Sequence, residues 1–416
     1  MDMGCGGALV HRTAESAARR SYGKLVAFLA ARSGDVAAAE DALSEAFASA
    51  LTDWPRKGCP DNPEAWLLIV ARRKLIDASR RRHGEAGDDE LENIADNLGA
   101  AAEQDELPDR RLALMFACAH PAIDRSIRAA LMLQTVLGLD AARIASAFLM
   151  SPTAMGQRLV RAKTKIRQAG IPFKIPEREE LSDRLETVLE AIYAAFAEGW
   201  MDAAGTDLAR RDLAEEAIYL SRLVTELLPG EPEALGVLAL MLYAEARRPA
   251  RRTSQGEYVP LAEQDPGLWN AQMIEEAESL LLRASPMGLI GRYQLEAAIQ
   301  SAHVARRIDG RANWSAIVSL YNALQLLTGS PVVAINRALA VAEIESPRAA
   351  LEAIDAAGAD PRVAAYQPYW AARAELLART GAREEAWHAY EIAIGLERDD
   401  SVRHFLERRR MGLRRE

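Results

Sequence analysis

The sequence predicts an all-α protein, and three observations carry that prediction. Of the 416 residues, 50% are hydrophobic but only 6% are aromatic, a composition typical of packed helices. Apolar residues recur at helical spacing in one segment after another, and no run alternates well enough to predict a strand. Gly and Pro separate these segments, as they do between helices. A chain of this length can form two or three domains, each with its own core.

Two changes of composition divide the chain. One segment contains ten acidic residues and no Lys or Arg, broken by Gly and Pro, which predicts a linker. A second break follows where Gly170, Pro172 and Pro176 lie close together. We therefore expect a helical domain, a linker, a second helical domain, a short linker and a long helical region. Their expected bounds are 10–83, 84–109, 110–170, 171–180 and 181–416.

The first domain is expected to end in a strongly basic helix. Asn62 can cap this helix and Pro63 fits its first turn. An apolar stripe starts at Trp66, Ile69 and Val70, and six cations lie on the polar side. Such a helix suits a run of backbone phosphates, although a charged helix face is more often simply solvated. The six cations are Arg72, Arg73, Lys74, Arg80, Arg81 and Arg82.

The segment before this helix strengthens the nucleic-acid interpretation. We expect a loop from Trp54 to Asp61 that holds an aromatic side chain, two prolines and the pair Arg56–Lys57. An aromatic ring beside cations can trap an unstacked base.

The second domain is predicted to contain a helix-turn-helix. Asp140 is a plausible cap for its first helix, and Ser151 with Pro152 starts the second. In the second helix four apolar residues recur at helical spacing and should face the core: Met155, Leu159, Ala162 and Ile166. Polar groups for base edges and cations for phosphates occupy the rest, with no acidic residue from 152 to 167. These polar groups are Thr153, Gln157, Arg158, Arg161, Lys163, Thr164 and Lys165.

The sequence of the long third region predicts helices that stack in pairs. Gly381 followed by Ala386, Tyr390 and Ala393 matches part of the tetratricopeptide pattern, whose repeat is about 34 residues. A generic helical bundle is the alternative. We favour an array because many helices in series need a way to stack.

Several classes of site and location are disfavoured. The three cysteines form no CxxC motif, and Cys118 with His120 is better read as core near a turn than as metal ligands. No secretion signal and no apolar stretch of roughly 18 residues is visible, so we expect a cytoplasmic protein without membrane contact. No phosphate-binding Gly loop or nucleophile elbow occurs, so we expect neither an enzyme nor a cofactor.

The charge distribution favours nucleic acid although the total does not. The net charge is −9. Residues 1–176 carry 24 basic and 22 acidic residues, ten of the latter within the linker, whereas residues 177–416 carry 27 basic and 38 acidic ones. The two small domains are therefore basic, and the linker and the third region are acidic.

These residues carry a resemblance to a known family. Two stretches resemble region 2 of an extracytoplasmic-function (ECF) sigma factor of bacterial RNA polymerase: GDVAAAEDALSEAF, from Gly34 to Phe47, and ALTDWPRKGCPDNPEAWLLIVARRKLIDASRRR. Two later stretches resemble region 4 of the same family: LALMFACAHPAI and GLDAARIASAFLMSPTAMGQRLVRAKTKIR. The segments IYAAFAEGW, YVPLAEQD and SPVVAINRALAVAEI resemble the long tetratricopeptide-like extension of one ECF subfamily. Where that subfamily has FNEGY, this chain has FAEGW.

The resemblance implies partners and roles for particular residues. Asp35, Glu40, Asp41 and Glu45 would contact the β′ clamp of core polymerase. The −10 promoter element would be bound by Trp54, Arg56, Lys57, Asn62, Trp66 and the six cations above. The −35 element would be read by the polar groups from Thr153 to Lys165, near the β flap. The acidic linker would follow the RNA exit path.

The third region is then expected to regulate the sigma domains in cis by an intramolecular contact, with Glu198, Gly199 and Trp200 as candidate contacts. Two other functions remain open. One is a helix-turn-helix regulator with a helical sensor, which leaves the basic first domain unexplained. The other is a scaffold whose repeats bind a partner protein.

Overall fold

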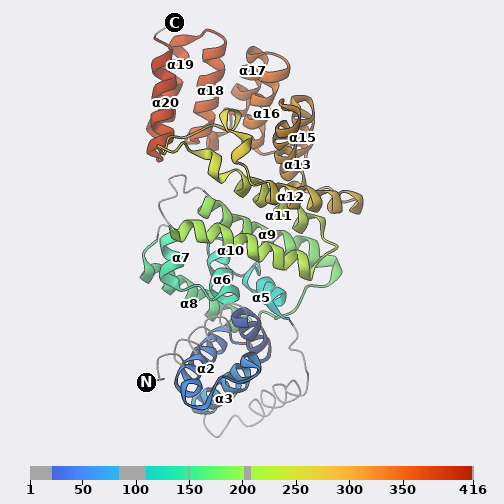
Figure 1. Ribbon diagram of the computed structural model, residues 1–416, viewed down its shortest axis with the longest axis vertical. Coiled ribbons are helices and arrows are strands. Elements are labelled where there is room, and N and C mark those ends of the chain that lie inside the picture. Colours follow the sequence, from blue (N-terminus) through green and yellow to red (C-terminus); the bar gives the residue numbers. More distant parts are fainter. Residues whose placement is uncertain (1–20, 84–108, 149, 201–207, 415–416) are drawn as a thin grey trace. The chain divides into compact units, whose positions relative to one another are not determined.

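The computed structural model describes residues 21–83, 109–148, 150–200 and 208–414. Within these residues the fold is all-α, as the sequence predicts, with an isolated bridge between Arg252 and Tyr258 and no strand (Figure 1). The chain separates into two compact units. The first reaches Gly199 and includes Ala209–Ala217, and the second holds the remainder. No helix of the described ranges is long and apolar enough to cross a membrane.

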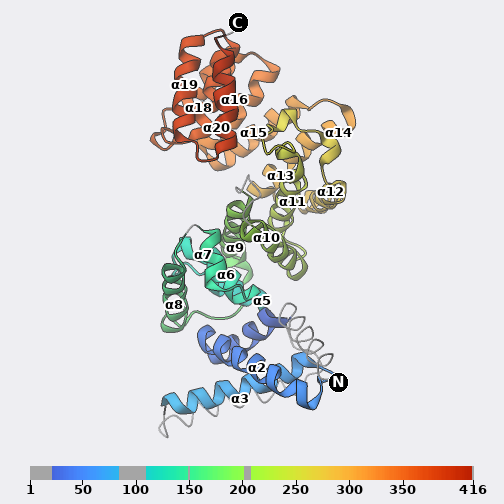
Figure 2. The same cartoon turned by 60° about the vertical axis from the view of Figure 1, so that its left-hand side comes forward.

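Three helices open the first unit: residues 21–33, α2 (Val36–Lys57) and α3 (Pro63–His83). Asp35 caps α2, because its side chain accepts a hydrogen bond from the Ala38 N–H. α2 and α3 lie side by side (Figure 2). Gly58 ends α2 with a φ of 87°, and its N–H donates to the Trp54 carbonyl.

Two details of these helices differ from the expectation. The predicted loop is shorter, since α2 continues through Pro55 to Lys57. The core face of α3 runs through Leu67, Ala71 and Leu75, whereas Ile69 is 46% exposed. The predicted stripe, which starts at Trp66 and Ile69, is therefore offset by about one residue from the core face. The prediction was wrong because apolar residues also occur on the outer side of this helix.

The second part of this unit contains four helices, which precede α9 (Arg178–Trp200). They are α5 (Arg111–Cys118), α6 (Arg125–Leu137), α7 (Ala141–Ala147) and α8 (Pro152–Gln168). The expected caps are present: the Asp140 carboxylate accepts from the Arg143 N–H, and the Ser151 hydroxyl from the Ala154 N–H. All four apolar residues expected on the core face of α8 are buried.

Cys118 is a core residue of this part. It is fully buried, and its Sγ lies 3.4 Å from Thr135 Oγ1. Burial raises the pKa of the Cys118 thiol to about 12. His120 Nδ1 instead accepts a hydrogen bond from the Ala122 N–H. Among the described residues no group of three or more His, Cys, Asp or Glu is arranged to hold a metal ion.

The second unit is a series of helices in which each packs mainly on helices one or two places away along the chain (Figure 1). This is the contact pattern of an array. Gly381 has a φ of 82°, and Ala386, Tyr390 and Ala393 are buried against α18 and α20. The helices are α10 (Leu208–Leu227), which straddles the two units, α11 (Pro232–Ala246), α12 (Ala271–Ala284), α13 (Arg292–Val304), α14 (Arg306–Asp309), α15 (Trp314–Thr328), α16 (Pro331–Ile344), α17 (Pro347–Ala357), α18 (Gln367–Arg379), α19 (Arg383–Leu396) and α20 (Asp400–Gly412).

The last helix packs back onto a segment near the beginning of this series. Arg252 Nη2 lies 2.7 Å from Asp399 Oδ2, and the rings of Tyr258 and Phe405 meet edge to face at 5.4 Å. These contacts join residues about 150 positions apart and tie α20 to the turn between α11 and α12.

Candidate nucleic-acid interface

The four acidic residues expected on α2 divide into two pairs. Asp35 and Glu40 are only 7% and 8% exposed, and both have cationic partners. Asp41 and Glu45 are exposed, and Glu45 Oε2 lies 3.3 Å from Lys74 Nζ of α3. Only the second pair is therefore presented to solvent in this structure.

Of the two tryptophans expected to contact the −10 element, Trp54 belongs to the core and Trp66 is half-buried. Trp54 is 2% exposed, and its ring meets that of Trp66 edge to face at 5.4 Å. Arg56 and Lys57 are exposed on the last turn of α2. Asn62 caps α3, as expected, by accepting from the Ala65 N–H at 3.0 Å. The Trp54 ring is therefore withdrawn from solvent, whereas Arg56, Lys57 and Asn62 are exposed.

The basic face of α3 is partly exposed. Arg73 and Arg80 are exposed, whereas Arg72 and Lys74 are half-buried. The side chains of Arg81 and Arg82 lie outside the described ones. Arg56 and Lys57 end α2 just before the loop that leads into α3, so the cations belong to adjacent elements. This surface can bind phosphates without displacing any core residue.

The polar face of α8 is presented as predicted for most of its residues. Thr153, Gln157, Arg161 and Lys165 are exposed, and Thr164 is half-buried. Ser151 and Pro152 set the start of the helix and so fix the direction of this face. An exposed helix face with short polar groups and Arg has the chemistry needed to contact base edges in a major groove.

Two predicted residues of α8 are held by other parts of the chain. Arg158 donates to the Ser126 hydroxyl and to Met150 Sδ. Lys163 is 10% exposed in its side chain, and its Nζ lies 2.5 Å from Glu40 Oε2. The structure thus brings together residues 123 positions apart that the sequence analysis assigned to two different surfaces.

Sequence reasoning overlooked two residues of α8. Val160 is 61% exposed between Gln157 and Arg161, on the face predicted to read DNA. Arg167 Nη1 lies 3.1 Å from Asp35 Oδ2, so it adds a second ion pair between α8 and α2. Val160 follows Gln157 by three residues, so helical spacing places it on the same face as the predicted polar groups. An apolar side chain at that position was the sequence signal that could have identified it.

Helix α9 contacts the α5–α8 part through polar groups. Arg184 Nη2 donates to the Phe116 carbonyl at 2.9 Å, and Glu190 Oε1 lies 2.9 Å from Arg125 Nη2. Glu198 and Trp200 lie at the end of the same helix, and the Trp200 carbonyl accepts from Arg251. The first helix after the second linker is therefore attached to the part that carries α8.

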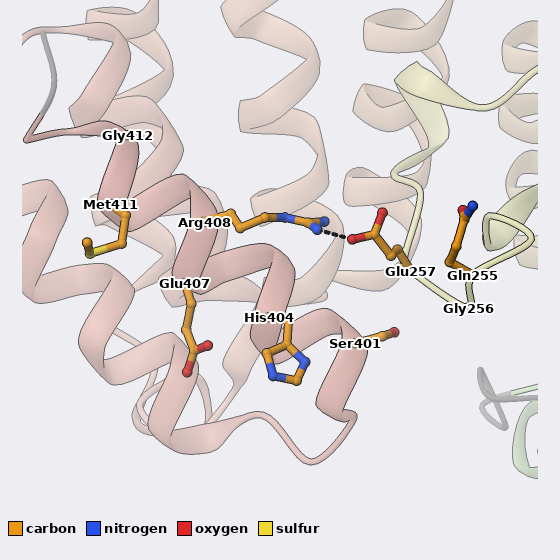
Figure 3. A pocket seen from close by; sticks show the side chains of 9 residues that line it. All are labelled: Gln255, Gly256, Glu257, Ser401, His404, Glu407, Arg408, Met411 and Gly412. Atoms are coloured by element: carbon orange, nitrogen blue, oxygen red, sulfur yellow. Dashed lines mark hydrogen bonds and ion pairs between the residues drawn. The ribbon is translucent and has the colours of Figure 1, made fainter.

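A separate cavity lies in the second unit. It has a volume of about 720 Å³ between α20 and the turn at Gln255–Glu257 (Figure 3). Its lining includes Ser401, His404 and Met411, and an ion pair joins Arg408 to Glu257. The mixed charge of this lining distinguishes it from the cationic faces of α3 and α8.

Comparison with known proteins gives matches to both units. Residues 18–85 match the family described as Sigma-70 region 2, which spans helix 21–33, α2 and α3. Residues 184–285 match a family described as being of unknown function (DUF6596). An uncharacterized protein of Rhizobium meliloti (strain 1021) is 39% identical over 368 residues, 86% of each chain. No solved structure matches.

Proposed function

We propose that this chain, which belongs to the same family as the Rhizobium meliloti protein and carries a sigma-70 region 2, is an ECF-type sigma factor. It directs core RNA polymerase to promoters by binding, without a catalytic step of its own, in the cytoplasm where polymerase and DNA meet. The observation that carries this proposal is the region 2 match, because the matched helices also present the exposed cations of α2 and α3.

Region 2 would combine two surfaces. Asp41 and Glu45, with Asp35 and Glu40 when these are released, bind the β′ clamp. Arg56, Lys57, Arg73 and Arg80 neutralise phosphates of the melted −10 strand. A flipped base would enter the loop between Gly58 and Asn62, above the Trp54–Trp66 pair, since both cations and Asn62 lie at its edges.

Region 4 would read the −35 element with α8. In a helix-turn-helix the second helix lies in the major groove, and its exposed residues contact base edges. Gln157 and Arg161 suit adenine and guanine, respectively. The cation Lys165 suits the flanking phosphate backbone.

The C-terminal helices would form a tetratricopeptide-like array that regulates region 4 in cis. The contacts of Arg184 and Glu190 with α5 and α6 support this role, since they connect α9 with the DNA-reading part.

The direct test is reconstitution with core polymerase. Overexpression with genome-wide transcript mapping would first supply promoters with shared −35 and −10 elements. The purified chain should then give promoter-dependent transcripts. A folded chain that gives none would refute the proposal, and tight duplex binding without polymerase would favour the regulator alternative.

A narrower prediction separates DNA reading from polymerase binding. Gln157→Ala and Arg161→Ala should each lower discrimination among −35 sequences, by about tenfold for a lost bidentate contact. Binding to core polymerase should be unchanged in both variants. Loss of polymerase binding would contradict the assignment of α8.

A further inference from the structure

Three arginines of the second unit lie together where two of its helices end. Arg247 directly follows α11, and Arg251 comes one turn later. Arg306 begins α14, just after α13, which packs on α11 (Figure 2). Burial, together with the charges of Arg251 and Arg306, lowers the pKa of Arg247 to about 10. The three guanidinium groups are therefore close enough to repel one another.

None of these three arginines has a carboxylate partner within the described ranges. Their hydrogen bonds to described residues all go to neutral oxygen atoms, because each acceptor is an amide or a backbone carbonyl. The acceptors are the Gln300 side chain and the carbonyls of Trp200, Tyr243, Leu261, Ala262 and Gln264. Such partners fix the direction of a guanidinium group but do not balance its charge.

Nearby acids and helix ends balance only part of this charge. Glu245 and Asp399 form ion pairs with two other arginines, and Glu263 and Asp265 are exposed. The C-terminal ends of α11 and α13 each carry about half a negative charge. About two of the three positive charges are therefore left without a counterion, although Arg247 is only 8% exposed. Buried charge without a counterion is unfavourable, so this cluster favours the binding of an anion.

The same cluster contains buried donors without an acceptor. Trp269 is only 6% exposed, and within the described part of the chain neither its Nε1 nor Arg306 Nε has a hydrogen-bond partner. Arg306 Cζ lies 5.0 Å from the centroid of the Trp269 ring, so the two residues belong to one site. Gln264 Oε1 is also unpartnered, and a water between it and Trp269 would satisfy one donor without supplying charge. An anion would supply both the acceptor atoms and the charge.

We propose that Arg247, Arg251 and Arg306 form a binding site for the phosphate group of a small ligand. A phosphate monoester carries about 1.5 to 2 negative charges at pH 7, which matches the charge left over in the cluster. The donors of a guanidinium group also match the geometry of phosphate oxygens. Arg251 and Arg306 are only partly buried, so a ligand reaches them from solvent.

This site goes beyond the proposed function, because it belongs to the second unit and includes no residue assigned to DNA or polymerase. A bound phosphate would join the end of α11 to the segment 261–264 through Arg306. Binding should therefore stabilise the folded second unit.

Arginine-to-methionine substitutions test the site. Arg247→Met and Arg251→Met each remove one charge and keep the aliphatic stem. Arg283→Met is the matched control, since Arg283 is an exposed arginine in the last turn of α12, also in the second unit. If Arg247→Met does not fold, Arg251→Met decides alone.

The first measurement is calorimetric titration of the full chain at pH 8 and constant ionic strength, with inorganic phosphate, glycerol 3-phosphate or chloride. Wild type and the Arg283→Met control should bind phosphate saturably, and chloride should not replace it. Arg247→Met and Arg251→Met should each bind at least about tenfold more weakly. Tighter binding of glycerol 3-phosphate than of inorganic phosphate would assign the site to a phosphorylated small molecule, and the reverse to free phosphate.

Urea unfolding with and without inorganic phosphate separates a binding role from a structural one. Phosphate should raise the urea midpoint of wild type and of the control, and should leave that of Arg247→Met and Arg251→Met unchanged. Arginines that only hold the chain together would lower the midpoint when replaced, yet leave the shift caused by phosphate intact. That result would overturn the proposal.

Equal phosphate affinity in all four proteins would also overturn it, because the phosphate would then bind to other cations such as those of α3 and α8. Absence of saturable binding to wild type would do the same. Neither result bears on the sigma-factor assignment, which promoter-dependent transcription decides.

Discussion

Asp35 holds two partners with two different oxygens. Its Oδ1 accepts from the Ala38 N–H at 3.1 Å and caps α2, and its Oδ2 pairs with Arg167. Asn caps helices as well as Asp does, whereas Ala does not cap them. Asp35→Ala should therefore be less stable than Asp35→Asn by about 1 kcal/mol in urea unfolding. Equal stability of the two variants would contradict the capping role.

Val160 is the residue at which an apolar contact with DNA is expected. An aliphatic side chain in a major groove contacts the C5-methyl group of thymine. Replacing one thymine of the −35 element by uracil removes only that methyl group. One such replacement should weaken duplex binding by the wild-type chain, by about 1 kcal/mol for a single methyl contact.

The same replacement should have no effect on Val160→Ala, which lacks the methyl groups that make the contact. Duplex-binding titrations of both proteins with thymine and uracil duplexes form a double-mutant cycle. Equal sensitivity of the two proteins at every thymine would contradict the contact. Thr153→Ala is a comparison variant on the same exposed face.

Residues also show where sequence reasoning reaches its limit. The core face of α8 was predictable from periodicity alone. Its four buried residues, Met155, Leu159, Ala162 and Ile166, recur at the spacing that places side chains on one side of a helix. Trp54 was expected in a loop, but α2 continues through Pro55 and buries the ring. Tertiary packing there outweighs the tendency of proline to end a helix. The Lys163–Glu40 pair had no sequence signal, since nothing local relates residues so far apart.

Among the elements, α13 contains a titratable group whose burial matters for stability. His303 packs edge to face on Trp314 with 5.6 Å between ring centroids. Burial lowers the pKa of His303 to about 4, and the nearby Arg247 and Arg306 guanidinium groups add to that shift. The unfolded chain, with an ordinary pKa near 6.5, then binds a proton more readily than the folded chain does.

Acidification should accordingly destabilise the second unit. The contribution of neutral His303 is complete above about pH 6.5 and is lost as pH falls toward 4, by up to about 2 kcal/mol at pH 5. His303→Gln should lose less stability than wild type between pH 7 and pH 5 in urea unfolding. His404→Gln, at an exposed position of α20, should follow wild type. Identical pH dependence of all three proteins would exclude His303 as the cause.

The elements themselves were largely predictable, and their arrangement was not. Composition and helical spacing indicated an all-α chain, and Ser151, Asp140 and Asn62 occupy the caps expected of them. The stripe on α3 was placed at Trp66 and Ile69 because apolar residues occur on two sides of that helix. Which side faces the core depends on α2, and a single helical pattern does not contain that information.

On the scale of the whole molecule, the uneven charge has a structural counterpart. The basic faces of α3 and α8 belong to the first unit, and the acidic C-terminal region supplies most of the second. Helix α9 begins the C-terminal region but belongs to the first unit, so the proposed regulation in cis would reach the α5–α8 part through Arg184 and Glu190. A change confined to α9 should then act on transcription in the same way as loss of the array.

Two variants test this prediction. Truncation after Lys174 should change promoter-dependent transcription in the reconstituted system, and Arg184→Met should change it in the same direction, because Met keeps the aliphatic stem but donates no hydrogen bond to the Phe116 carbonyl. Arg178→Met, at an exposed position of the same helix, should transcribe like wild type. Wild-type transcription by the truncated chain would remove the regulatory role. Opposite effects of Arg184→Met and truncation would assign regulation to a contact other than this one.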